Sequence, residues 1–519
     1  MNWKRPLAIT LAAATFGTTL AACGAPADSG AQASSTPAAQ AQNLSNEAVK
    51  APKYVFLFIG DGMSYPQIQS TADYLGALED ADYWQAEPSL DDNGGAVLDG
   101  PSYLNFMNFE AAGSAVTYDS NSFCPDSAST ATSISTGHKT YSGTINMDET
   151  GTTAYETVAE KVHDQLGMKV GVISSVNLNH ATPAAFYAHQ ASRNDYYEIG
   201  LELVDSGFEY FAGGGLLKPT GAEGDQEDLY TLAEEAGYNV VKAQAEAEQV
   251  TEGPVVIVDE HLADGDAMAY ELDRTDDMWA LADYVEKGIE VLDNDKGFFM
   301  MCEGGKIDWA CHANDAASSI HDTKALADAV QVAIDFAEEH PDETLILVTG
   351  DHETGGLTIG FSGTDYDTYL NLLESQKISF AKYDSDYVAA YKENKTSFED
   401  VLADIENLFG LKTEGEEGDK LVLTPYELSQ LKTAYEKSIN ETATGMDEQQ
   451  EYVMYGTYEP LTVTITHILN NKSGVSFTSY SHTGLPVAVL AHGLNAEQFN
   501  GYYDNTEIFN KLADMLSVQ

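Results

Sequence analysis

The run Lys53-Tyr-Val-Phe-Leu-Phe-Ile-Gly60 gives the clearest indication of fold in this chain. Its apolar side chains are consecutive rather than alternating, a pattern typical of a parallel strand that is buried on both faces. The run ends in glycine and is followed at once by Asp61, and the residues after Ser64 have a helical pattern. The sequence therefore predicts a central buried strand with a carboxylate just past its carboxyl end.

Similar apolar runs and helical patterns alternate along the rest of the chain. Further buried strands are predicted at Lys169–Ser174, Val255–Val258, Gly297–Cys302, Thr344–Thr349 and Pro486–Leu490. Helices are predicted at Thr153–Leu166, Asp195–Asp205, Asp276–Leu292 and Asp315–Glu339. This alternation predicts an α/β fold, a three-layer α/β/α sandwich with a large, mostly parallel central sheet. Binding sites of such sheets gather at the carboxyl ends of the strands.

One long stretch breaks the alternation. Residues Phe361 to Ser476 are rich in Tyr, Glu and Lys and contain loop-like and helical pieces. We interpret this stretch as a crown-like insertion or cap at about residues 361–476, within one domain that spans residues 51–519.

The N-terminal residues have the pattern of an export signal. Lys4 and Arg5 precede an apolar stretch that ends in Leu20-Ala-Ala-Cys23. This order predicts a lipoprotein signal peptide over residues 1–22 and a lipidated Cys23; an ordinary signal peptide cleaved nearby is the alternative. Residues 23–50, rich in Ala, Ser, Gln and Pro, are predicted to form a flexible tether. We therefore expect an exported protein, lipid-anchored to a membrane in the periplasm or at the cell surface.

The chain is strongly acidic. Its 83 Asp and Glu residues against 25 Lys and Arg give a formal net charge of −58. Because phosphate groups attract basic surfaces, this composition argues against a nucleic-acid partner. Adaptation to high salt, which screens the self-repulsion of such a charge, is the favoured explanation, and solubility alone is the alternative.

The cysteine spacing indicates neither a disulfide framework nor a zinc motif. Beyond Cys23, the cysteines are Cys124, Cys302 and Cys311. We interpret these three as free, mostly buried thiols, with a Cys302–Cys311 bridge as the alternative.

A candidate nucleophile lies in Cys124-Pro-Asp-Ser-Ala-Ser-Thr-Ala-Thr-Ser-Ile-Ser-Thr-Gly137. The small residues after Asp126 predict a helix that begins at or near Ser127. The unpaired N–H groups at such a helix start attract an anion, so the Ser127 hydroxyl could attack a phosphoryl group there. Taken alone, Asp-Ser before a helix is more often an ordinary N-cap.

Metal-binding side chains follow several of the predicted strands. Asp308 and His312 are four residues apart, so on a helix they share one face and could hold one cation. The other candidates are Asp61, Glu303, Asp351, His352 and His482. Each has a structural alternative, such as a surface helix pair, a turn cap or a core histidine. Their shared position at predicted strand ends favours one joint site.

This set of side chains suits chemistry at phosphorus. Two cations about 4 Å apart can activate a nucleophile and stabilise a leaving oxygen. Imidazole with carboxylate favours zinc, whereas Glu303 with a threonine hydroxyl and waters favours magnesium. Transferring phosphoryl oxygens also need a planar donor, for which Arg193, after a segment containing Thr182, is the candidate.

These motifs resemble those of a known family. They are Phe58-Ile-Gly-Asp-Gly-Met63, Asp126-Ser-Ala128 with Ser135-Thr-Gly137, His180-Ala-Thr-Pro-Ala-Ala185 followed by Arg193, Glu303 through His312, Thr349-Gly-Asp-His352, and His482-Thr-Gly484. In this order they resemble the motifs of bacterial alkaline phosphatases, from about Lys53 to the C-terminus without the insertion. The resemblance implies hydrolysis of phosphate monoesters at alkaline pH.

The resemblance also implies a role for each site residue. Ser127 would form a phosphoserine intermediate, and Arg193, oriented by Asp126, would hold the phosphate. One zinc would be held by Asp308, His312 and His482, a second by Asp61, Asp351 and His352, and a third ion, usually magnesium, by Asp61, Thr182 and Glu303.

Two positions vary within the family. Trp309 follows the ligand Asp308 where many members carry a Lys or His that contacts phosphate, so we expect looser phosphate binding and faster product release. His180 stands where some members have Asp near the magnesium site, which leaves zinc, with His180 among its ligands, as the alternative third metal.

Other functions stay open at this point. A phosphodiesterase of the same superfamily is the alternative activity, whereas a sulfatase is disfavoured because Cys124-Pro125-Asp126 lacks the sulfatase pattern. A non-catalytic surface lipoprotein that binds cations leaves the ordered ligand set unexplained. We expect a homodimer, with a monomer as the alternative.

Overall fold

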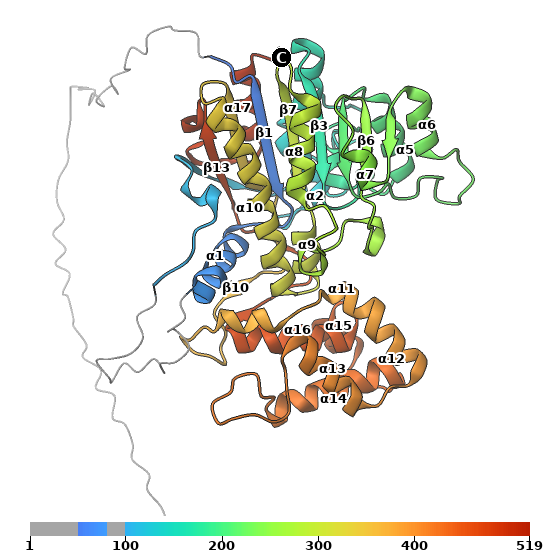
Figure 1. The fold of residues 1–519 in the computed structure, drawn as a ribbon, viewed down its shortest axis with the longest axis vertical. Coiled ribbons are helices and arrows are strands. Elements are labelled where there is room, and N and C mark those ends of the chain that lie inside the picture. Colours follow the sequence, from blue (N-terminus) through green and yellow to red (C-terminus); the bar gives the residue numbers. More distant parts are fainter. Residues whose placement is uncertain (1–49, 80–98) are drawn as a thin grey trace, which may run out of the picture. The chain divides into compact units, whose positions relative to one another are not determined.

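A ten-stranded sheet forms the centre of the computed structural model, which describes residues 50–79 and 99–519 (Figure 1). The strand order is β14-β2-β13-β8-β1-β7-β3-β4-β6-β5. The strands are β1 (Tyr54–Gly60), β2 (Ala111–Val116), β3 (Lys169–Ser174), β4 (Tyr210–Gly213), β5 (Asn239–Val241), β6 (Val255–Val258), β7 (Phe298–Gly304), β8 (Thr344–Gly350), β13 (Val487–Gly493) and β14 (Gly501–Asp504). Only β13 runs antiparallel to its neighbours in this sheet. The predicted α/β sandwich with a mostly parallel sheet is confirmed.

Strand β1 lies between β7 and β8, and these three strands end in register. Gly60, the last residue of β1, is paired with Gly304 of β7 and with Gly350 of β8. All seven residues of β1 are buried, as the apolar run predicts. The residues at and just after these three strand ends therefore meet at one edge of the sheet.

Helices cover both faces of the sheet. Alternate side chains of β1 enter two separate cores: Val55 and Leu57 join the core beneath α2 and α17, and Phe56 and Phe58 join the core beneath α8 and α10. Figure 1 shows α8 and α10 crossing the face of the sheet that is turned toward the viewer. These helices and their neighbours are α1 (Tyr65–Glu79), α2 (Ser127–Thr136), α3 (Val158–Lys161), α4 (Ala181–Ala184), α5 (Tyr196–Asp205), α6 (Leu229–Ala236), α7 (Gln244–Ala247), α8 (Leu281–Leu292), α9 (Lys306–His312), α10 (Ala316–Glu339) and α17 (Thr506–Leu516).

The helix predicted at Thr153–Leu166 begins later than expected. Thr157 and Glu160 form a capping box, so α3 starts only after Thr157 and continues as a π-helical turn. Before this cap, Ala154 pairs with Met147 in a short antiparallel bridge. The prediction was wrong for these first residues because a cap and a backbone partner in the preceding turn outweigh local helix propensity. Helix α8 likewise begins later than predicted.

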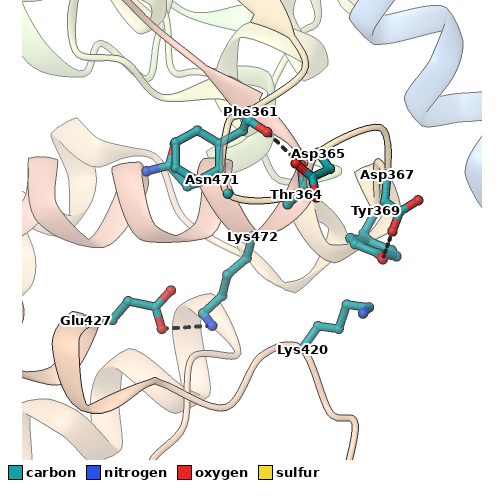
Figure 2. Close-up of a pocket in the computed structure, with 10 residues that line it drawn as sticks. Phe361, Thr364, Asp365, Asp367, Tyr369, Lys420, Glu427, Asn471 and Lys472 are labelled. Carbon is teal, nitrogen blue, oxygen red and sulfur yellow. Dashed lines mark hydrogen bonds and ion pairs between the residues drawn. The ribbon is translucent and has the colours of Figure 1, made fainter. Parts of the chain in front are cut away.

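The insertion at about residues 361–476 is joined to the rest of the domain by a two-stranded ribbon. Strand β10 (Thr358–Ile359) pairs antiparallel with β11 (Val475–Ser476). Between them lie α11 (Phe380–Tyr383), α12 (Ala389–Asn394), α13 (Phe398–Phe409), α14 (Pro425–Asn440), α15 (Glu448–Tyr455) and α16 (Pro460–Ser473). Helices α11, α12, α13, α14 and α16 contribute side chains to one hydrophobic core. A polar pocket of about 400 Å³ lies in this segment, where Lys472 pairs with Glu427 at 2.9 Å (Figure 2).

Several sequence predictions fall outside the described residues. The signal peptide, Cys23 and the tether lie within or next to residues 1–49, which the structure does not describe. Within residues 50–79 and 99–519, no helix has the length and apolar character needed to cross a membrane. The three cysteines of this part are free: Cys302 and Cys311 are buried and Cys124 is exposed. The alternative of a Cys302–Cys311 bridge is therefore wrong.

Candidate active site

Three strand ends bring buried carboxylates together. Asp61 follows β1, Asp351 follows β8, and Glu303 is the penultimate residue of β7, so the register of these strands puts all three at one edge. None of the three is more than 1% exposed. Burial and the other carboxylates raise the pKa of Asp61 well above its usual value, and burial raises the pKa of Asp351 to about 8 and that of Glu303 to about 7.

Asp61, Asp351 and His352 form one group of potential metal ligands, with their ligand atoms all within 4.8 Å of one another. Nε2 of His352 lies 3.4 Å from Oδ1 of Asp61 and 3.4 Å from Oδ2 of Asp351. The other oxygen of Asp351 accepts hydrogen bonds from the backbone N–H groups of Gly62 and His352. One side of this carboxylate is thus held by the backbone and the other faces the imidazole.

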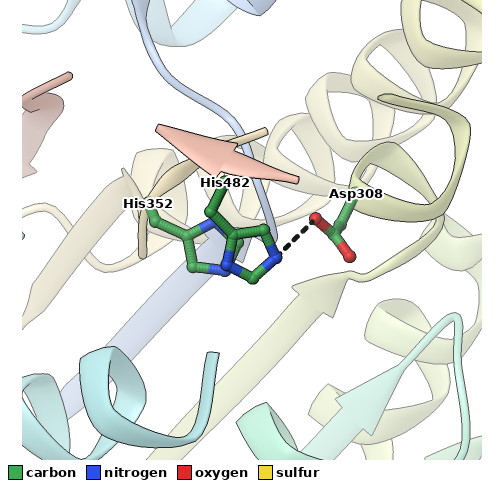
Figure 3. Close-up of side chains that lie close together, drawn as sticks. All are labelled: Asp308, His352 and His482. Carbon is green, nitrogen blue, oxygen red and sulfur yellow. Dashed lines mark ion pairs between the residues drawn. The ribbon is translucent and has the colours of Figure 1, made fainter. Parts of the chain in front are cut away.

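Asp308, His352 and His482 form a second such group, so His352 belongs to both (Figure 3). His312 lies beside it, with its Nε2 3.3 Å from Oδ2 of Asp308 and 3.0 Å from Nε2 of His482. Burial alone would lower the pKa of His312, but the Asp308 carboxylate raises it to about 9. The ring of His352 also stacks on the ring of His482, with 3.7 Å between their centroids.

Backbone carbonyls orient two of these imidazoles. Nδ1 of His312 lies 2.6 Å from the carbonyl of Tyr480, and Nδ1 of His482 lies 2.6 Å from the carbonyl of Pro125. A carbonyl only accepts, so each Nδ1 carries the donated proton. In the neutral rings both Nε2 lone pairs then point at each other and at Asp308. Lone pairs and a carboxylate that converge in this way suit a cation. Histidines that bind metals in proteins usually donate the proton on their other ring nitrogen to a carbonyl or carboxylate, as these two do.

The donor set as a whole fits metal ions. Within residues 50–79 and 99–519, no ion pair joins Asp61, Glu303 or Asp351 to a lysine or arginine. In the same part of the chain, Oδ1 of Asp61, Oε1 of Glu303 and Nδ1 of His180 are buried without a hydrogen-bond partner. Burying unpaired carboxylates is expensive unless cations balance them. Metal cations, with oxygen and imidazole ligands, supply that balance.

Glu303 lies where oxygen ligands dominate. Its Oε2 accepts a hydrogen bond from the hydroxyl of Ser174, which is at the end of β3. Thr182, on α4, donates from its hydroxyl to Oδ2 of Asp61 at 3.3 Å. Carboxylate and hydroxyl oxygens of this kind suit magnesium better than zinc.

Ser127 is the first residue of α2 and is 2% exposed. Its Oγ lies 3.2 Å from Nε2 of His352, the imidazole that both ligand groups share. The helix is capped at its start by Asp126 and at its end by Gly137, whose φ of 75° a residue with a Cβ adopts only with strain. The Ser127 hydroxyl is thus at a helix N-terminus and beside the ligand groups at once.

Asp126 connects this helix start to Arg193. Oδ1 of Asp126 accepts from the backbone N–H of Ser129, and its Oδ2 accepts from Nη1 of Arg193 at 2.9 Å. Burial alone would raise the pKa of Asp126, but Arg193 and the N–H of Gly143 lower it below its usual value. A charged guanidinium is therefore held close to Ser127 by the residue that caps its helix.

His180 lies beside Arg193 and Trp309 and is in neither ligand group. Its Nε2 is 3.5 Å from Nη2 of Arg193, and its ring meets the ring of Trp309 edge to face at 5.9 Å. Burial and Arg193 lower the pKa of His180 to about 3, so this imidazole is neutral. The Trp309 ring also lies 4.6 Å from Nζ of Lys306, a buried ammonium that pairs with Asp264 at 2.7 Å.

Sequence reasoning missed the residues that support the ligands. Thr354 donates from its hydroxyl to Oδ1 of Asp308 at 2.5 Å. Oγ1 of Thr354 also lies 3.2 Å from Nδ1 of His352. Thr130 donates to Oδ2 of Asp351 at 3.1 Å. Thr354 follows the Asp351-His352 pair so closely that its position gave a signal, whereas nothing local distinguishes Thr130 from other small residues of α2.

The chain is similar to known proteins over nearly its whole length. A family model described as alkaline phosphatase matches residues 52–518. Alkaline phosphatase 3 of Bacillus subtilis (strain 168) is 30% identical over 485 residues, which cover 91% of each chain. The crystal structure of a cold-active alkaline phosphatase from Shewanella sp. has a TM-score of 0.68 at 28% identity and covers 89% of this chain and 99% of its own.

A more distant structure shows the same fold. Thermus thermophilus alkaline phosphatase has a TM-score of 0.71 at 22% identity, covering 91% of this chain and 92% of its own. The family match, the relative and the fold agree with the motifs at the strand ends. This chain therefore belongs to the alkaline phosphatase family of enzymes.

Proposed function

We propose that this chain is a metal-dependent phosphomonoesterase in which the Ser127 hydroxyl takes up the phosphoryl group. The observation that carries the proposal is the place of Ser127: its Oγ is at the N-terminus of α2 and 3.2 Å from the imidazole that both ligand groups share. A phosphate in front of α2 meets the unpaired N–H groups of the helix start and the positive end of its dipole.

The chain's own residues then act on the ester. The Ser127 hydroxyl gives its proton to water and its oxygen attacks phosphorus, so that a new oxygen–phosphorus bond forms. The bond to the leaving oxygen breaks, and that oxygen takes a proton from water to leave as the alcohol. Arg193 binds phosphoryl oxygens, held in place through Nη1 by Asp126. Water then attacks the phosphoserine, which releases inorganic phosphate and restores the Ser127 hydroxyl.

Metal ions would supply Lewis-acid chemistry, lowering the pKa of the attacking groups and stabilising charge on the leaving oxygen. We propose zinc with Asp308, His312 and His482, and zinc with Asp61, Asp351 and His352. Magnesium, with zinc as the alternative, is proposed with Asp61, Thr182 and Glu303. The convergent Nε2 lone pairs and the buried carboxylates without cationic partners support this division.

The test is hydrolysis of p-nitrophenyl phosphate at pH 8–10 by protein without residues 1–23. We expect activity that is lost to EDTA and restored by zinc with magnesium. Higher rates on a phosphate diester than on the monoester would favour the phosphodiesterase alternative. A protein that binds zinc and hydrolyses neither ester, at low or high salt, would overturn the proposed activity.

We further propose that the protein is exported and anchored through a lipid on Cys23. The order of basic residues, apolar stretch and Leu20-Ala-Ala-Cys23 supports this. Mass spectrometry of the mature N-terminus should find a diacylglyceryl group on Cys23, and Cys23→Ala should release the protein from the membrane fraction. An unmodified mature N-terminus would contradict the anchor.

A further inference from the structure

Glu353 is a fully buried residue that has no role in the proposed reaction. It is 0% exposed and comes directly after His352. Its Oε1 accepts hydrogen bonds from Nε2 of Gln67 at 2.9 Å and from the N–H of Leu357 at 3.0 Å. Its Oε2 accepts from the N–H of Gly356 at 3.1 Å and from the hydroxyl of Thr483.

These four donors are all neutral. Across residues 50–79 and 99–519, no ion pair joins Glu353 to a lysine, an arginine or a histidine. A buried carboxyl group in such surroundings is tolerated only while its hydrogen bonds are complete. Each donor is therefore held firmly to the carboxylate, and so is the element that carries the donor.

The carboxylate joins the two segments that carry His352 and His482. Strands β9 (Glu353–Thr354) and β12 (His482–Thr483) pair antiparallel, with Thr483 opposite Glu353. A ribbon of two residues on each side has little stability of its own. The hydrogen bond from the Thr483 hydroxyl to Glu353 adds a side-chain link across it, directly beside the stacked imidazoles.

Gln67 extends this link to the first strand. It is fully buried on α1, and besides Glu353 its Nε2 donates to the carbonyl of Thr354 at 3.0 Å. Its Oε1 accepts from the N–H of Ser64 at 3.0 Å, in the turn that follows Asp61. One carboxylate thus connects the segments that carry Asp61, His352 and His482.

We propose that Glu353 is a positioning residue that sets the distance between His352 and His482. It thereby keeps the side chains of both ligand groups at the separations that metal binding needs. It touches neither substrate nor metal and acts through Thr483 and Gln67. The proposal rests on the proposed function, because it takes these histidines as ligands. Residues that orient metal ligands in this way typically change metal affinity by about 10- to 100-fold when they are removed.

The test measures zinc release rather than phosphatase activity. Zinc-loaded wild-type protein, Glu353→Gln, Thr483→Val and Thr483→Ser are mixed with a chromogenic chelator, and the rate of zinc transfer is followed. Thr483→Ser keeps the hydroxyl, whereas Thr483→Val keeps the branched shape and loses it. We expect zinc loss to be about tenfold faster or more in Glu353→Gln and Thr483→Val, and close to the wild-type rate in Thr483→Ser.

The outcomes separate this proposal from the metal site itself. Wild-type release rates in Glu353→Gln and Thr483→Val would overturn the positioning role, even if both variants melt at lower temperature. Equal acceleration in Thr483→Val and Thr483→Ser would overturn it too, because packing rather than the hydroxyl would then be responsible. If Glu353→Gln does not fold, the threonine pair still decides. A wild-type protein that retains no zinc would overturn the proposed metal site and this inference with it.

Discussion

The carboxylates of the active site and those of the insertion are balanced in opposite ways. At the strand ends, Asp61, Glu303 and Asp351 are buried, and within the described residues no lysine or arginine pairs with them. In the insertion, lysines pair with carboxylates at the protein surface. These pairs are Lys392–Glu459, Lys412–Asp419, Lys437–Glu451 and Lys472–Glu427.

The difference shows which part of the molecule depends on something from solution. Partly exposed ion pairs are solvated and screened and contribute little, typically under about 1 kcal/mol each. Buried carboxylates without partners are costly, so cations that the chain does not provide would stabilise the proposed site. We therefore expect the insertion to be indifferent to metal removal and the strand-end site to be sensitive to it.

The largest effect should come from the proposed nucleophile. Ser127→Ala removes the oxygen proposed to accept the phosphoryl group, and we expect p-nitrophenyl phosphate hydrolysis to fall by about 10³-fold or more while zinc content is kept. Ser133→Ala is the matched control, because that serine lies on the same helix and its hydroxyl bonds only the carbonyl of Ser129. Activity above a tenth of wild type in Ser127→Ala would remove Ser127 from this role.

A smaller effect is expected at position 309, where the chain has an uncharged tryptophan. Trp309→Lys adds an ammonium beside His180 and Arg193, and we expect the inhibition constant for inorganic phosphate to fall by about tenfold, since a hydrogen bond to a charged group contributes about 1.5–3 kcal/mol. Trp309→Phe keeps an aromatic ring without charge and should not tighten binding. An unchanged constant in Trp309→Lys would show that position 309 does not reach the phosphate.

Asp384 tests whether the insertion also contains a carboxyl group that is costly to ionise. Burial raises the pKa of this carboxyl to about 7, while the Thr462 hydroxyl lowers it. The folded state therefore binds the proton more tightly than the unfolded state, so the stabilising contribution is complete only below about pH 4 and is lost as the pH rises through 7.

Asp384→Asn stays neutral and escapes this loss. We expect its advantage in the free energy of unfolding over wild type to grow by on the order of 2 kcal/mol between pH 5 and pH 9. Urea denaturation at both pH values measures it, and Asp386→Asn, an exposed neighbour, is the control. An advantage that does not change with pH would show that the Asp384 carboxyl titrates normally.

The smallest effect should come from an ordinary cap in the insertion. Thr424 and Glu427 form the capping box of α14, so Thr424→Ala should cost about 1 kcal/mol in the free energy of unfolding. Thr433→Ala, at a half-buried position in the interior of the same helix, should cost less. Phosphatase activity and zinc content should stay at wild-type values in both. A loss of zinc in Thr424→Ala would contradict the independence of the two regions.

The strands and the edge of the sheet where the site lies could be predicted from the sequence. Each of the runs that became β1, β3, β6 and β7 is locally apolar, and strand formation of this kind needs no knowledge of the partner. Because parallel strands align their carboxyl ends, Asp61 and Asp351 could be placed at one edge before any contact was known. Strands β2, β4, β5 and β14 of the same sheet were not predicted.

The contacts among the candidate ligands could not be predicted. His352 faces Asp61 and Asp351 and also stacks on His482, and the sequence could not show this double role. Local patterns report which side chains a segment can bury. Which imidazole faces which carboxylate depends on hydrogen bonds between segments more than a hundred residues apart, such as the one from Thr483 to Glu353. Those bonds exist only once the sheet has assembled, so their geometry is a property of the folded protein.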